Sequence, residues 1–362
     1  MAVSLPHDSG GSLDFSRNEW TGAIGDSVTV LPVVVSVAVL TELSLVSLLV
    51  WFGVFQIVWG LYYGAPVSVE PMKALAALVL AGTITTGEFL LSGLFVGVAL
   101  LAIGATGSLD RVSSYVGSPV VRGVQLAVAL VLLETGVRLA GADLRLAGAA
   151  AVAAVAVIAL GYGNLSALLV LCLGGGVAVA SAGLPSPTAP TTDGVLAFGV
   201  SDLTRPAAEA AVAQLAMSVG NAALATSLLL KDYFDRDISA DDLSSSMGVM
   251  NLVAVPFGSL PMCHGSGGVA GKYAFGARTA GSNVILGIGY VAVAVFAAGI
   301  VAAYPVSMLG VILGVVALQL GRTSLEKTEH LPFVVAIGVC GLVVNLGVAF
   351  LLGAVGYLLL YR

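Results

Sequence analysis

The sequence predicts an all-α polytopic membrane protein, made of two related halves that each contain seven transmembrane segments, one of which is a half-helix. Three observations predict this fold class: a strongly apolar composition, fourteen apolar segments, and a Pro-Met motif that recurs in the second half. Because seven crossings per half is an odd number, the two halves would have opposite orientations in the membrane.

The composition excludes a soluble protein. Of 362 residues, 58% are hydrophobic and 9% are charged, whereas a soluble domain carries about 25% charged residues. The apolar surface must therefore face lipid. The net charge of −6, without a run of basic residues, argues against a nucleic-acid partner. The cysteines Cys172, Cys263 and Cys340 lack ligand spacing, so we expect no disulfide framework, no metal site and no cofactor.

Apolar segments separated by short polar breaks organise the chain. In the first half, residues 21–183, they lie at 22–41, 44–63, 70–82, 86–106, 118–140, 147–161 and 164–182. After a loop at 184–205, the second half, residues 206–362, has segments at 206–230, 247–259, 262–274, 281–302, 304–320, 331–344 and 345–361. Segments 70–82 and 262–274 are too short to cross a hydrocarbon core of about 30 Å. Twelve crossings with two re-entrant pieces are therefore the alternative.

The placement of basic residues supports fourteen crossings with segment 1–20 in the cytoplasm. That segment is polar and lacks the apolar stretch of a signal peptide. The residues expected on the cytoplasmic side are Arg17, Arg111, Arg122, Lys231, Arg236, Lys272, Arg278, Arg322, Lys327 and Arg362. Only Arg138, Arg145 and Arg205 are expected outside, which fits the positive-inside rule. Lys73 is then the one basic residue placed well inside a segment.

A motif in the first half recurs in the second. Residues 65–73 read APVSVEPMK and residues 255–263 read VPFGSLPMC, so Pro66, Pro71 and Met72 have counterparts 190 residues later. Both copies lie at matching positions of the two halves. This agreement predicts an inverted repeat, the arrangement that many transporters share.

Each Pro-Met pair is predicted to begin a half-helix near the bilayer midplane, because proline breaks the helix that it would interrupt. A helix N-terminus offers free N–H groups and about half a positive charge. Two such termini that meet at the pseudo-twofold axis would form an anion site. Gly265, Gly267 and Gly268 would let backbone amides approach a ligand closely. Plain helix packing by these glycines is the alternative.

Three ionisable residues of the first half are candidates for this site. Lys73 would add positive charge for an anion, or would be a structural partner for Glu70. Glu70 would carry a proton, because burial favours the neutral carboxyl form, or would cap a helix or pair with Lys73. Asp26, which follows Gly25, is the only acid in the first segment. Charges inside a membrane are costly and mostly functional.

The second half contributes neutral polar candidates. Gln214, Ser218 and Asn221 match the region around the first-half acid and are expected to line the site, unless they only make interhelical hydrogen bonds. His264 and Ser266 lie where the second half-helix begins. His264 would donate to an oxyanion or relay a proton, and a hydrogen-bonded core histidine is the alternative.

Three stretches resemble the molybdate transporter family of the sulfate permease superfamily: GAIGDSVTVLP at 22–32, PVSVEPMKALAA at 66–77, and PMCHGSGGVAGKYAFGART at 261–279. The resemblance covers essentially the whole chain in order and spacing. It implies a seven-plus-seven inverted repeat with a core domain and a gate domain. It also implies secondary active uptake of a tetrahedral oxyanion, most characteristically molybdate.

The resemblance also assigns residues. The motif positions carried onto this chain are Gly25, Asp26, Pro71, Met72, Lys73, His264, Gly265, Gly267 and Gly268. Two departures leave the anion and the coupling ion open: Glu70 stands where the family usually has Gln, and Ser27–Val30 replace a usual Gly and aromatic residue. The expected partners are a small oxyanion and the lipid bilayer, with a co-transported proton and a second copy of the chain as open alternatives.

Other functions remain as alternatives. Sulfate and tungstate share the charge and shape of molybdate, and a nucleobase would suit a site with carboxylates and amides, although Lys73 counts against it. A membrane enzyme would use Cys263 and His264, but adjacent residues on a helix point about 100° apart and share a proton poorly. A channel is disfavoured because broken helices in an inverted repeat favour alternating access.

Overall fold

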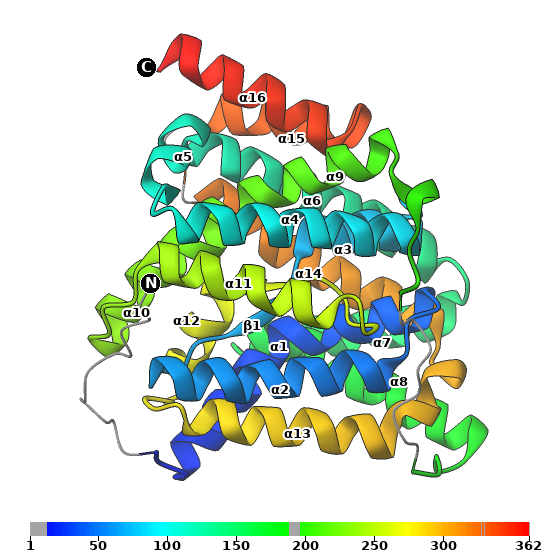
Figure 1. Cartoon of the computed structure of the whole chain (residues 1–362). Coiled ribbons are helices and arrows are strands. Elements are labelled where there is room, and N and C mark those ends of the chain that lie inside the picture. Colours follow the sequence, from blue (N-terminus) through cyan, green and yellow to red (C-terminus); the bar gives the residue numbers. More distant parts are fainter. Residues whose placement is uncertain (1–12, 188–195, 327, 329, 362) are drawn as a thin grey trace.

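The computed structural model describes residues 13–187, 196–326, 328 and 330–361. Long helices lie side by side through the molecule, and β1 lies among them in the middle (Figure 1). Eight helical stretches of the described residues are long and apolar enough to cross a membrane. Shorter helices complete the two sets of seven segments that the sequence predicts.

The elements of the first half are α1 (Arg17–Leu40), α2 (Leu45–Tyr63), β1 (Val69–Pro71), α3 (Lys73–Ala81), α4 (Thr86–Ala105), α5 (Leu109–Val116), α6 (Ser118–Ala140), α7 (Leu144–Ala159), η1 (Gly163–Leu165) and α8 (Ser166–Ala182). The elements of the second half are η2 (Val200–Asp202), α9 (Arg205–Met217), η3 (Ser218–Leu224), α10 (Ala225–Phe234), α11 (Ala240–Ala254), β2 (Met262–His264), α12 (Ser266–Ala274), α13 (Gly281–Ala297), η4 (Ala298–Ala303), α14 (Val306–Glu326), α15 (Leu331–Val343) and α16 (Leu346–Leu360).

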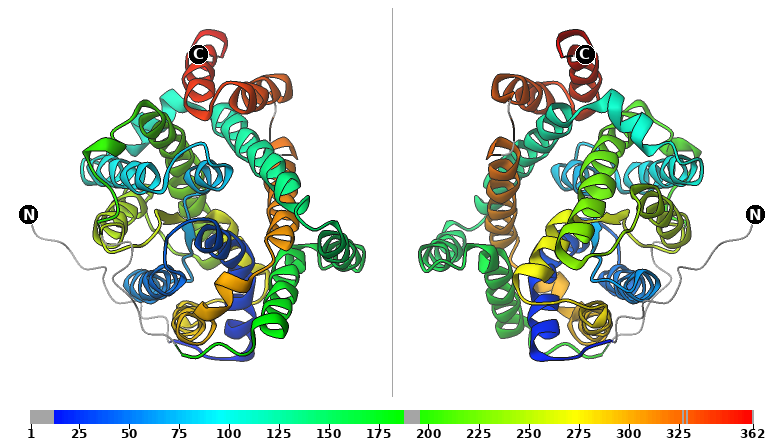
Figure 2. Two further views of the ribbon diagram at one scale, coloured as in Figure 1. Left: turned by 90° about the vertical axis from the view of Figure 1, so that its right-hand side faces the viewer. Right: turned by 90° about the vertical axis from the view of Figure 1, so that its left-hand side faces the viewer.

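The helices form two groups, which Figure 2 shows side by side. We call α1–α4 and α9–α13 the core, and α6–α8 and α14–α16 the gate. Each group combines both halves of the chain: α11 packs on α4 and α13 on α2 in the core, while α14 packs on α6 in the gate. The connections from core to gate run through α5 and η4.

The two half-helices form as predicted, but the second begins later than its motif indicates. Helix α3 follows directly after Pro71 and Met72, whereas the second Pro-Met pair leads into β2 and α12 begins only at Ser266. The prediction that this second pair starts a half-helix is therefore wrong by a few residues. Each half-helix has nine residues, a length of about 14 Å.

The strands β1 and β2 pair antiparallel and join the two half-helices. Val69 is opposite His264, Glu70 opposite Cys263, and Pro71 opposite Met262. Side-chain amides of the neighbouring helices satisfy the outer carbonyls: Gln56 Nε2 of α2 donates to Val69 O at 3.1 Å. Asn251 of α11 likewise donates to Met262 O at 2.6 Å. This anchoring is how extended backbone is tolerated at membrane depth.

Three features differ from the predicted segments. Helix α5 is amphipathic, with Leu109 and Val116 buried and polar residues exposed, so it has no continuous apolar run. Helix α11 begins at Ala240 rather than at 247, because Ser239 caps a polar first turn by accepting from Asp242 N. The stretch 205–234 is one continuous helix that widens into a π-helix at η3.

A close crossing of α6 and α14 through glycine holds the gate together. A Cβ atom on Gly136 would lie 2.7 Å from the carbonyl oxygen of Gly310. We expect Gly136→Leu to separate the two helices and to destabilise the protein by about 1–3 kcal/mol, the usual cost of overpacking. Thermal unfolding of the purified protein measures this loss.

Gly148→Leu is the matched control for that substitution, because Gly148 also lies inside a helix but has nothing within 4 Å of an added Cβ. Both changes gain the same helix propensity. Equal melting temperatures for the two variants would contradict the close α6–α14 crossing.

Candidate functional site

A cavity of about 380 Å³ lies between the core and the gate, at the first turns of the half-helices. Its polar lining comes from both groups of helices: Thr29, Lys73, Asn221 and Ser266 from the core, with Gln125, Asn164, Gln319 and Thr323 from the gate side. Among the described residues that line it, Lys73 is the only one with a charged side chain. The wall therefore presents one ammonium group and no carboxylate.

The start of α12 offers backbone donors to this cavity. Ser266 and Gly267 line it, and their N–H groups have no protein acceptor among the described residues. The next amide, Gly268 N, donates to Glu70 Oε1 at 2.6 Å. A Cβ atom on Gly265 would overlap the Glu70 carboxyl group. Glycine is thus required at Gly265 for a carboxylate of the first half to cap a helix of the second.

The start of α3 is closed from the opposite half in the same way. Gln214 Oε1, from α9, accepts from Ala74 N at 3.0 Å and from Leu75 N at 3.4 Å. Gln214 Nε2 in turn donates to Ser218 Oγ at 3.0 Å. Gln214 therefore satisfies two N–H groups at the start of α3, and neither Gln214 nor Ser218 is among the residues that line the cavity.

Lys73 and Glu70 form an ion pair at the edge of the cavity. The Glu70 side chain is fully buried, whereas the Lys73 side chain is 18% exposed. A ligand that enters the cavity would meet the ammonium group and not the carboxylate behind it.

Asp26 also has a cationic partner, and that partner corrects a prediction. Lys272 is fully buried in α12, with Nζ 3.0 Å from Asp26 Oδ2, although the charge pattern placed it on the cytoplasmic side. Lys73 is therefore not the only lysine inside a segment. Ser68 Oγ at 2.6 Å and Gln56 Nε2 at 3.0 Å also donate to the Asp26 carboxylate.

A polar network encloses this second ion pair. Lys272 Nζ also donates to Val67 O at 2.5 Å and to Asn283 Oδ1 at 2.9 Å. Asn283 Nδ2 donates to the side chain and the backbone of Gln56. Asp26 and Lys272 are satisfied by these contacts, and neither side chain lines the cavity.

His264 is buried and hydrogen-bonded within the core. Its Nε2 lies 2.7 Å from Ser246 Oγ, and its Nδ1 lies 3.0 Å from the carbonyl oxygen of Ser68. The neighbouring Cys263 Sγ lies 3.9 Å from the carbonyl oxygen of Pro71. The two side chains that a membrane enzyme would use have separate partners.

The residues singled out in the sequence thus fall into two groups. Those that line the cavity are Gly25, Lys73, Asn221, Ser266 and Gly267. Those that lie behind the lining are Asp26, Glu70, Pro71, Met72, Gln214, Ser218, His264, Gly265 and Gly268. Sequence reasoning missed the gate residues Gln125, Asn164, Gln319 and Thr323, of which the first three are amides inside the predicted apolar segments.

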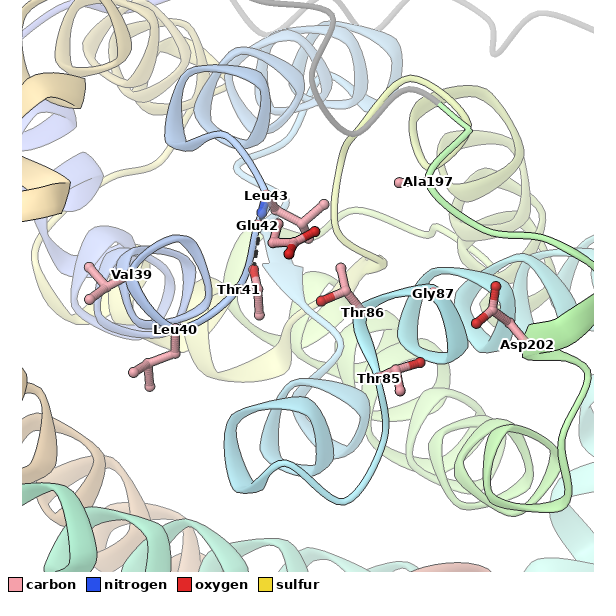
Figure 3. A pocket seen from close by; sticks show the side chains of 10 residues that line it. All are labelled: Val39, Leu40, Thr41, Glu42, Leu43, Thr85, Thr86, Gly87, Ala197 and Asp202. Atoms are coloured by element: carbon pink, nitrogen blue, oxygen red, sulfur yellow. Dashed lines mark hydrogen bonds between the residues drawn. The ribbon is translucent and has the colours of Figure 1, made fainter.

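A second hollow, of about 960 Å³, lies where α1 ends and α4 begins. Figure 3 shows its lining, with the carboxylates of Glu42 and Asp202 on different sides. The described residues that line it include no basic side chain. This hollow has the wrong charge for an anion, which favours the cavity between the half-helices.

Comparisons with known proteins agree with this architecture. The family model described as "Molybdate transporter of MFS superfamily" matches residues 18–132 and 206–320. The chain belongs to this molybdate transporter family. The two matched stretches have the same length and begin 188 residues apart, as expected of a repeat. The exact limits proposed for the halves, 21–183 and 206–362, stay a prediction.

Relatives of this transporter are found in plants and algae. It is 29% identical to molybdate transporter 2 of Arabidopsis thaliana, over 95% of this chain and 87% of that protein. It is 27% identical to molybdate transporter 1 of the same plant, over 95% and 88% of the two chains. Molybdate transporter 1 of Chlamydomonas reinhardtii is 25% identical, over 94% and 90%.

Solved structures confirm the fold class. The transmembrane domain of a cyanobacterium bicarbonate transporter, BicA, superposes with a TM-score of 0.66 at 15% identity, over 92% of this chain and 97% of that one. SLC26A9 superposes with a TM-score of 0.69 at 12% identity, over 94% and 64%. The protein is a multi-pass membrane transporter with the seven-plus-seven inverted-repeat fold, and not an enzyme.

The buried pair of Asp26 and Lys272 gives a stability prediction for this transporter. We expect Lys272→Met to destabilise the protein by about 3–5 kcal/mol, because it leaves a buried carboxylate without a countercharge. Thermal unfolding in detergent measures the effect. The double variant Asp26→Asn with Lys272→Met should regain most of the loss. If the double variant unfolds at the same temperature as the single one, the ion pair is not the cause.

Proposed function

We propose that this chain imports a tetrahedral oxyanion, most characteristically molybdate, by secondary active transport. The observation that carries this proposal is the cavity wall: Lys73 is its only charged side chain among the described residues, beside the open N–H groups of Ser266 and Gly267. An ammonium group and a helix N-terminus both favour an anion. The names of the relatives support molybdate within this class.

The proposed access route leads to the cytoplasm. The cavity extends from Lys73 towards Thr323 and Phe275, at the end of the bundle where α1 begins. The positive-inside rule assigns this end to the cytoplasm. At the opposite end, Arg138 of the gate donates to the carbonyl oxygen of Ala81, which ends half-helix α3 of the core, at 3.0 Å. We therefore assign this conformation as inward-facing.

A nucleobase fits this cavity less well than an oxyanion does. A nucleobase carries N–H donors that need acceptors, and Glu70 is absent from the described lining. Its two oxygens are occupied by Lys73 and by Gly268 N. Sulfate and tungstate remain rivals to molybdate, because they would make the same contacts.

The proposal includes Glu70 as the proton carrier. Its carboxylate faces Lys73 on α3, Cys263 on β2 and the ion pair formed by Asp26 on α1 and Lys272 on α12. Protonation of Glu70 would release Lys73 from its partner and turn its charge to the anion. Proton and anion would then bind together, and their joint release would follow in the cytoplasm.

Removal of the Lys73 charge tests the anion site. We expect Lys73→Ala to weaken molybdate binding by about 10-fold or more, because hydrogen bonds to charged groups contribute about 1.5–3 kcal/mol. Binding of radiolabelled molybdate to the purified protein measures the loss. Lys231→Ala, at an exposed surface ion pair, is the control and should bind normally.

The double variant Lys73→Ala with Glu70→Gln separates a lost attraction from a newly unpaired carboxylate, and it should also bind weakly. Competition by unlabelled molybdate, tungstate, sulfate and uracil in proteoliposomes identifies the substrate. Wild-type affinity in Lys73→Ala and in the double variant, or displacement by uracil alone, would overturn the oxyanion site.

Substitution of Glu70 tests the proton carrier. Transport that depends on protonation of Glu70 should rise as the external pH falls. Glu70→Gln mimics the protonated form, so it should keep molybdate binding and lose most of this pH dependence. Initial uptake rates into proteoliposomes, compared from acidic to mildly alkaline external pH, measure this pH dependence. A variant with the wild-type pH profile would exclude Glu70 as the carrier.

A further inference from the structure

The gate contributes a glutamine to the cavity with an orientation that chemistry fixes. Gln125 on α6 is 3% exposed and lines the cavity. One turn earlier, Arg122 Nη1 donates to Gln125 Oε1 at 2.8 Å. A guanidinium group has only donors, so it must hold the amide oxygen and not the amide nitrogen. The NH₂ group of Gln125 therefore points away from Arg122.

This NH₂ group differs from those of the other glutamines. The chain contains four glutamines, and the amide nitrogens of Gln56, Gln214 and Gln319 all donate to protein oxygens. Gln125 Nε2 has no acceptor among the described residues. It is also not among the described side-chain atoms that are fully buried without a hydrogen-bond partner. It is a donor that faces the cavity.

We propose that Gln125 binds the substrate from the gate side, and that Arg122 is a positioning residue that presents the Gln125 NH₂ group. This inference rests on the proposed oxyanion function. An oxyanion accepts hydrogen bonds on all sides, so a site for it needs donors on both walls. Lys73, Ser266 and Gly267 supply donors from the core, and Gln125 supplies one from the gate. The bound anion would then connect the two groups of helices.

Two substitutions of Gln125 test this role. Gln125→Leu removes the donor, and molybdate binding should weaken about 10-fold. Gln125→Glu has the same size and keeps the contact with Arg122, but replaces the donor by a second oxygen. It should bind more weakly than Gln125→Leu. A glutamine that makes no contact with the anion would instead leave molybdate binding by Gln125→Leu close to wild type.

The positioning role of Arg122 is tested by non-additivity. Arg122→Met leaves the amide free to turn between two orientations, of which one presents the donor, so binding should weaken about 2-fold. In the Gln125→Leu background the same change should have no further effect, because the group that it positions is absent. Arg111→Met, at an exposed arginine on α5 near the same end of the bundle, should leave binding unchanged in both backgrounds.

The binding measurements separate the possible failures. A further loss in the double variant would show that Arg122 attracts the anion by its own charge, which overturns the positioning role. Wild-type affinity in Gln125→Leu would overturn the gate-side contact. A wild-type protein that binds no molybdate, tungstate or sulfate would instead overturn the proposed function. Thermal unfolding of each variant checks that a loss of binding is not a loss of folded protein.

Discussion

Two helices that begin in the middle of a bilayer set the constraint that the rest of the core meets. Their first N–H groups need acceptors from protein or from a ligand, because lipid offers none. The pairing of β1 with β2 places each start beside the opposite half. There Gln214 reaches α3, and Glu70 reaches α12. Each half of the chain therefore completes the broken helix of the other.

The balance of charge follows from the same constraint. Asp26 is paired with Lys272 and Glu70 with Lys73, so these four buried or half-buried charges sum to zero. A single unpaired carboxylate in this environment would be costly. The pairing also keeps both carboxylates behind the cavity lining. The wall then offers a ligand an ammonium group and a helix start, although the site as a whole is neutral.

The half-helices could be predicted from sequence because proline and glycine act on their own backbone. The exact start of α12 could not be predicted from the second Pro-Met pair. The residues after that pair form β2, and this strand exists only because it pairs with β1. The sequence placed Lys272 at the cytoplasmic surface, whereas it is buried. Its burial depends on the ion pair with Asp26, which lies on another helix. The position of Gln125 on the cavity wall could not be predicted, because a lone amide in an apolar segment can equally make a hydrogen bond between two helices.

The two halves share a backbone plan but differ in polar chemistry at matching positions. The repeat offset of 188 residues places Gln214 on the position of Asp26. The neutral Gln214 accepts from two N–H groups at the start of α3, those of Ala74 and Leu75. Asp26 is instead engaged by Lys272, and α12 keeps the amides of Ser266 and Gly267 open. The matching positions thereby differ in function, because the amide oxygen of Gln214 occupies two N–H groups of α3, while α12 keeps two donors for the proposed oxyanion.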